Sequence, residues 1–179
     1  VYKRQEIIAW DLALAGSLSR LEIGSGATLT WSQGAKGSQV VSQAAGTSVH
    51  NQGTMRLNSG DLVFKTDDTR QLTISGTATS AVEVQGGTLS LGDYGPPSGG
   101  TLTASMPGAV MVASGATFAN RDATLTLQPS GGTIAGHWLQ AGGSSTVNTG
   151  AQTPVFQSLT IEGGSLSLTN AASAQAFNQ

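Results

Sequence analysis

The chain has 179 residues, enough for one domain with a sizeable core, or for a solenoid that has no single compact core. Only 10% of the residues are charged, and branched apolar residues are spread throughout, which excludes a charge-rich disordered chain. The net charge of −2 gives no electrostatic case for nucleic acid or an anionic membrane, and the lack of Cys excludes disulfides, thiolate zinc sites and Cys nucleophiles. The 25 glycines indicate an all-β chain with many small turns.

The first residues resemble something other than natural protein sequence. Val1 to Gln5 look like the translation of a transposon end used in preparing sequencing libraries. We therefore expect residues 1–5 to be a scar, and 6–179 to be part of one β-helix that is cut at both ends. No signal peptide or membrane-spanning run is visible, because the apolar stretch from Ile7 to Ala15 is short and contains Asp11. The alternation of Trp10, Leu12 and Leu14 predicts a strand there.

A short unit recurs along the rest of the chain. It consists of a small turn residue, then Thr or Ser, an apolar residue, a small or polar residue and often a second apolar residue. Copies occupy 26–31, 53–57, 87–91, 100–103, 115–118, 123–127, 132–134, 158–161 and 164–168. Further alternating pairs are Leu62/Phe64, Leu72/Ile74, Val82/Val84 and Val110/Val112. Such alternation predicts many short, half-buried strands, and helical periodicity is weak even in the Ala-rich tail from Ala171 to Ala176.

Two architectures use many short strands, a hairpin-built sandwich or barrel and a β-solenoid. The repeated unit and the lack of Asn-Gly or Asp-Gly hairpin turns favour the solenoid. Asn recurs beside the strand units, so we expect Asn side chains of successive coils to bond to one another; these are Asn51, Asn58, Asn120, Asn148 and Asn170. Thr28 and Thr54 are 26 residues apart, whereas 13 residues separate Thr88 from Thr101 and 16 separate Thr101 from Thr117. This mixture predicts two or three strands per coil with turns of variable length.

At this point the residues resemble a known family. The stretch from Gly46 to Leu57, GTSVHNQGTMRL, is similar to the coil motif of autotransporter passenger domains, as are 114–127 and 131–168. The resemblance covers roughly residues 20–170 and is shared by pectin-lyase-like and filamentous-haemagglutinin-like β-helices. It implies export through a C-terminal outer-membrane barrel outside this segment, and roles in adhesion or aggregation. The fold predicted is all-β, a right-handed single-stranded parallel β-helix.

Candidate chemical groups are few. His50 and His137 each stand alone in polar, strand-like sequence, and Asp67-Asp68 with Arg70 is typical of a turn with a local charge pair. The other acids are scattered, at Asp61, Glu83, Asp93, Asp122 and Glu162. No Gly-x-Ser-x-Gly elbow occurs, and the Gly-Gly steps at 99–100 and 142–143 lack the Lys-Ser/Thr of a phosphate loop. We therefore predict no catalytic, cofactor-binding or metal-binding residue.

Charge is unevenly distributed. Residues 1–70 hold seven of the eight basic residues, and no charge occurs between Asp122 and Glu162. The C-terminal part is thus an almost uncharged surface of Ser, Thr, Gly, Gln and Asn, suited to a plain stalk, to binding glycans or to association with like molecules.

The prediction is a non-catalytic structural and adhesive segment of a bacterial surface or secreted protein, located outside the cell. Its expected partners are glycans, a host surface or like molecules on neighbouring cells, without nucleic acid or cofactors. A first alternative is a polysaccharide-active β-helix, which would need acids stacked in one groove. A second is an ice-binding solenoid, suggested by Thr-x-Thr at 28/30, 77/79, 101/103 and 124/126. Ice binding needs these pairs in register on one flat face, and their irregular spacing argues against it.

Overall fold

The computed structural model describes residues 4–7, 12–14, 19–32, 38–67, 70–93, 100–128, 131–148 and 155–169. Within these residues the regular structure is entirely β, in three sheets. Sheet A contains β1 (Arg4–Ile7), β4 (Thr28–Trp31), β7 (Thr54–Leu57), β10 (Ala81–Val84) and β13 (Ala109–Val112). Sheet B contains β2 (Leu12–Leu14), β5 (Ser38–Ser42), β8 (Asp61–Thr66), β11 (Thr88–Leu91), β14 (Thr117–Asn120), β16 (His137–Gln140) and β18 (Ser158–Ile161). Sheet C contains β3 (Arg20–Ile23), β6 (Thr47–Asn51), β9 (Gln71–Gly76), β12 (Thr101–Met106), β15 (Thr124–Leu127), β17 (Ser144–Asn148) and β19 (Ser165–Thr169).

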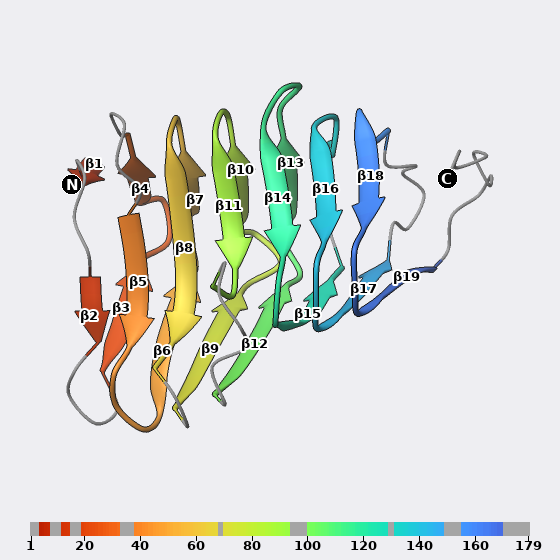
Figure 1. The fold of residues 1–179 in the computed structure, drawn as a ribbon. Coiled ribbons are helices and arrows are strands. Elements are labelled where there is room, and N and C mark those ends of the chain that lie inside the picture. The colour runs from red at the N-terminus through yellow and green to blue at the C-terminus, as the bar shows by residue number, and fades with distance from the viewer. Residues whose placement is uncertain are drawn as a thin grey trace.

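The chain visits the three sheets in turn, so that each strand pairs with the strand one coil earlier and one coil later. All the strand pairs in the described residues are parallel. Figure 1 shows the strands of each sheet side by side along the axis, from β2 and β3 at the N-terminal end to β18 and β19 at the C-terminal end. The molecule is therefore a parallel β-solenoid, as the repeated unit predicts, while the right-handed sense of its coil stays a prediction.

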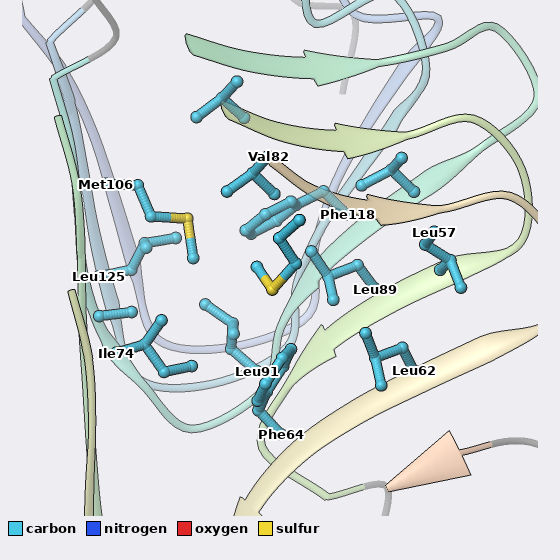
Figure 2. Close-up of a cluster of buried hydrophobic side chains, with 14 of the residues drawn as sticks. Leu57, Leu62, Phe64, Ile74, Val82, Leu89, Leu91, Met106, Phe118 and Leu125 are labelled. Carbon is cyan, nitrogen blue, oxygen red and sulfur yellow. The ribbon is translucent and has the colours of Figure 1, made fainter. Parts of the chain in front are cut away.

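The core is a column of apolar side chains between the sheets. Alternate residues point inward, and in β12 the pattern is strict, with Leu102, Ala104 and Met106 buried between exposed neighbours. Figure 2 shows side chains from all three sheets meeting in the interior, among them Val82 of sheet A, Phe64 of sheet B and Leu125 of sheet C. Each fully buried Leu, Val or Phe contributes roughly 1.5–3 kcal/mol, so stability accumulates coil by coil.

Coil length changes along the stack. Thr28 pairs with Thr54 at a separation of 26 residues, and Thr88 pairs with Thr117 at 29, so these threonines mark full coils. Thr101 lies in a different sheet from Thr88, which explains the shorter spacings seen in the sequence. Towards the C-terminus, Phe118 pairs with Trp138 at a separation of 20 and Trp138 with Leu159 at 21.

The shorter coils arise because sheet A ends. After β13 its place is taken by a single bridge between Val112 and Ile134, although 132–134 was predicted to be a strand. Beyond it, the described coils contain only a sheet B strand and a sheet C strand. The prediction of two or three strands per coil is therefore confirmed. Phe118 and Trp138 stack at this narrowing with ring centroids 5.0 Å apart, and Phe156 meets Trp138 edge-on.

The remaining predicted units all lie in strands: 26–31 in β4, 53–57 in β7, and the others in β8 to β15, β18 and β19. The strand expected over Ile7 to Leu14 appears as β1 and β2, with Trp10 outside the described residues. β1 begins at Arg4 and so includes two residues of the expected scar. The tail from Ala171 to Ala176 lies outside the described part of the chain.

Stacking of Asn on Asn is wrong for the buried asparagines. Asn51 pairs in register with Ile23 and Gly76, and Asn120 with Leu91 and Gln140. Their amides instead hold the turn that follows each strand. Asn51 Oδ1 accepts the Gly53 N–H at 3.1 Å, and Asn120 Oδ1 accepts the Ala123 N–H at 2.8 Å.

Candidate functional site

The most regular surface in the described residues is the outer side of sheet C from β9 to β19. Two adjacent columns of hydroxyl side chains run along it, because outward positions two residues apart hold Ser or Thr in every one of these strands. We call this surface the hydroxyl face. The first column is Thr73, Thr103, Thr124, Ser144 and Ser165, and the second is Ser75, Ser105, Thr126, Thr146 and Ser167.

These hydroxyls are available to an outside partner. Eight of the ten residues are exposed, and Ser75 and Thr126 are half-buried. Among the described residues, only the Ser75 hydroxyl of this set bonds to another side chain, that of His50 at 2.8 Å. Parallel strand geometry spaces the hydroxyls about 4.8 Å apart between strands and about 6.7 Å apart along each strand. Each hydroxyl can donate one hydrogen bond and accept two, so the face is a two-dimensional array of donors and acceptors.

The hydroxyl face is uncharged, and charge begins only where sheet C continues toward the N-terminus. There the same two columns hold Arg20 and Ser48, and Glu22 and His50. Arg20 Nε lies 3.4 Å from Glu22 Oε2, and both side chains are about half exposed, so the ion pair adds little stability.

The outer sides of the other two sheets lack this regularity. Sheet A carries Arg56 and Glu83 at registered positions, with Arg56 Nε 2.5 Å from Glu83 Oε2. The hydrogen bond to Glu83 raises the pKa of Arg56, opposed by desolvation and assisted by the Coulombic attraction of Glu83. Sheet B buries its outward Val63, Ser90 and Ala119. The Ser and Thr pattern on sheet C is thus specific to one of three faces.

Neither histidine lies in a cluster of ligating or catalytic groups. Each bonds through Nδ1 to a Ser hydroxyl of the next coil: His50 to Ser75 at 2.8 Å, and His137 to Ser158 at 2.7 Å. The two pairs recur on different sheets, which indicates a stacking contact between coils. Among the described residues no group of three or more His, Asp or Glu could hold one metal ion.

The charged turn at 67–70 is partly described. The Arg70 backbone N–H donates to the Asp67 carbonyl at 3.0 Å, which closes a turn between β8 and β9. Asp68 lies outside the described residues. The turn predicted from these residues is confirmed, while their charge pairing stays a prediction.

The scattered acids do not meet in one groove within the described residues. Asp61 is exposed on sheet B, Glu83 is paired on sheet A, and Asp93 Oδ2 lies 2.9 Å from Lys65 Nζ. Asp122 and Glu162 follow β14 and β18 at the corner between sheets B and C. Burial raises the pKa of the Asp122 carboxyl, and no other charged group contributes to that shift. The arrangement offers no paired carboxylates for acid–base work on a sugar.

The Thr-x-Thr pairs fall at different places. Thr30 is buried on sheet A, and Thr77 and Thr79 bond to each other in a turn. The other two pairs lie on the hydroxyl face, one step out of phase, because Thr103 pairs with Thr124. Sequence reasoning expected an uncharged Ser- and Thr-rich surface but missed its register. The alternation in 124–127 and 165–168 carried the signal, but nothing showed that both lie on one sheet.

No helix in the described residues is long and apolar enough to cross a membrane. Comparison of the chain with protein-family models, with curated proteins and with solved structures gave no match in any of the three. The fold and the hydroxyl face are therefore the observations from which a function is argued.

Proposed function

We propose that this chain is a non-catalytic, structural and adhesive segment of an autotransporter-type bacterial surface protein, located outside the cell. The observation that carries the proposal is the hydroxyl face, an uncharged, in-register array that runs over five coils of a parallel stack. A stack of coils supplies length and rigidity, since each coil contacts its neighbours along the axis. The resemblance of 46–57 to the passenger coil motif supports the family assignment.

The ligand class proposed for the face is a neutral glycan. Sugars offer hydroxyl donors and acceptors in series, which suits an array of Ser and Thr hydroxyls without charge. Single hydroxyl contacts are weak, so affinity would come from many contacts made together along the columns. Nucleic acid is a poor partner for this surface, because the hydroxyl face carries no Lys or Arg to neutralise phosphates.

Binding of the full chain to arrayed neutral polysaccharides tests the proposal. Thr146→Lys adds a charge in the middle of the hydroxyl face, and we expect it to weaken retention about tenfold or more. Thr160→Lys is the matched control, an exposed Thr on sheet B in the next coil. Both are surface changes that should alter the free energy of unfolding by less than about 0.5 kcal/mol. Equal loss in the two variants, or no retention of any neutral glycan by the unmodified chain, would refute the proposal.

Ice binding is a second candidate favoured by one specific observation, the registered hydroxyl columns of β12, β15, β17 and β19. It differs from the first in its readout. An ice-binding face inhibits ice recrystallisation in the absence of any glycan, and Thr146→Lys should abolish that inhibition while Thr160→Lys leaves it intact. Ice growth unaffected by the unmodified chain removes this candidate and leaves the glycan proposal standing.

A further inference from the structure

The C-terminal end of the described stack is an open surface. β18 and β19 are the last strands in the orders of sheets B and C, and each has a strand on one side only. Their other edges present unpaired backbone N–H and C=O groups to whatever lies next along the axis. Figure 1 shows both strands at that end of the molecule. We call this surface, formed by β18 and β19, the end face.

Core positions lose their cover at the end face. In the column Leu91, Asn120, Gln140 and Ile161, the first three side chains are fully buried, whereas Ile161 is 57% exposed. The sheet C columns behave in the same way. Leu125 and Ser145 are buried, as are Leu127 and Val147, but Leu166 and Leu168 in β19 are only partly buried. Because every earlier member of these columns is covered by the next parallel coil, the missing cover has the shape of such a coil.

Solenoids are usually closed by a terminal repeat with a polar outer surface. The end face has the opposite character, since Leu159, Ile161, Leu166 and Leu168 bring apolar surface to an unpaired double strand edge. A flat edge with exposed apolar residues and no charge is a template for pairing with another chain. No Lys, Arg, Asp or Pro lies within β18 or β19 to prevent it.

The opposite end of the stack carries a matching edge. β2 and β3 are the first strands of sheets B and C and also have a strand on one side only. Beside β3 lies a hollow of about 190 Å³, lined by apolar residues that include Leu21, Ile23 and Leu29. A coil that starts with these strands would continue sheets B and C in the same parallel sense.

We propose that the end face docks a second copy of this chain head to tail, with β18 and β19 pairing onto β2 and β3 of the next molecule. Such a contact joins two different surfaces, so it repeats without closing and produces linear assemblies. The inference is independent of the hydroxyl face, which points sideways from the axis and stays exposed along the assembly.

Sedimentation velocity of the purified chain over a wide range of concentration, with negative-stain imaging, tests the proposal. We expect mass to increase with concentration and particles to lengthen without widening. Ile161→Lys places a charge on the end face at a position that is already exposed, so folding should be retained. It should weaken association about tenfold or more. Thr160→Lys adds the same charge to the same strand on the outward side and should leave association unchanged.

The outcomes separate the possible occupants. Association lost with Ile161→Lys but kept with Thr160→Lys supports docking on the end face. A chain that stays monomeric at every concentration, with β18 and β19 amides protected from hydrogen exchange, would show that its own residues cover the end face and would overturn the proposal. Assemblies that are equally sensitive to both variants, or that stop at a closed dimer, would overturn it as well. Loss of glycan binding with intact assembly would affect only the proposed function.

Discussion

At the scale of single residues, the corners of the solenoid depend on glycine. Gly87 lies between β10 and β11 with φ of 75°, a left-handed conformation. A Cβ built on it would lie 1.7 Å from the carbonyl oxygen of Gly60, which occupies the same corner one coil earlier. The close approach lets successive coils keep the strand spacing of the sheets. A side chain there would push the coils apart.

Gly87→Ala should therefore lower the free energy of unfolding by about 2–5 kcal/mol, the sum of left-handed strain and overpacking. Gly115→Ala is the control, because Gly115 has φ of 80° but no atom within 4 Å of the added Cβ. It should cost only about 1–2 kcal/mol. Urea unfolding followed by circular dichroism measures both. Equal costs would mean that the close approach to Gly60 does not restrict the corner.

Asp122 predicts a pH dependence. Burial raises the pKa of its carboxyl in the folded chain above the unfolded value, so protonation favours folding. The stability gained from this proton is fully present below the unfolded pKa and is lost as pH rises through the folded pKa. Asp122→Asn should thus stabilise the chain at neutral pH, by less than about 1 kcal/mol, and have no such effect in acid.

Thermal unfolding of both proteins at acidic and neutral pH checks this expectation. Asp61→Asn, which changes an exposed carboxylate, is the control and should give no comparable gain at neutral pH. A gain for Asp122→Asn that is as large in acid as at neutral pH would show that burial of the charge is not its cause.

At the scale of elements, the alternation of apolar and polar residues located most strands. It failed where a polar side chain points inward. β5, β16 and β17 were not predicted, and they bury Ser38 and Ser42, Gln140, and Ser145 at inward positions. These groups are largely satisfied by one another. Asn120 Nδ2 donates to Ser145 Oγ at 2.8 Å, and Ser145 Oγ donates to Gln140 Oε1 at 2.7 Å. A periodicity based on hydropathy cannot recognise such strands, because their partners come from other coils.

The same network gives a prediction about coil joining. Asn120→Ala removes both the amide oxygen that holds the Ala123 N–H and the bond to Ser145, leaving buried polar groups without partners. We expect a loss of about 2–4 kcal/mol in the free energy of unfolding. Asn58→Ala is the control, since Asn58 is exposed and bonds to Ser32 at 3.0 Å, and it should cost less than about 0.5 kcal/mol. Comparable losses would remove the network from the account of stability.

At the scale of the whole molecule, the sequence predicted a parallel solenoid but not its cross-section. The change from three strands per coil to two occurs where 131–135 replace a sheet A strand with the single Val112–Ile134 bridge. Nothing in the residues of that segment marks the change, because Gly132-Thr133-Ile134 looks like the start of another strand unit. The hydroxyl face was hidden for a related reason. Its columns exist only once register aligns strands that are 20 to 30 residues apart in the chain.

Register on sheet C is the claim on which the hydroxyl face and the parallel stack both depend, and engineered disulfides measure it directly. The chain has no Cys, so a pair introduced at Thr103 and Thr124 can only bond to each other or between molecules. These residues are Cα partners on neighbouring strands, about 4.8 Å apart, within disulfide reach. Thr103 and Thr126 are diagonal, about 8 Å apart, and beyond it. We predict that mild oxidation closes an intramolecular disulfide in the Thr103→Cys/Thr124→Cys chain and not in the Thr103→Cys/Thr126→Cys chain. Closure of the diagonal pair instead, or of neither pair, would contradict the account.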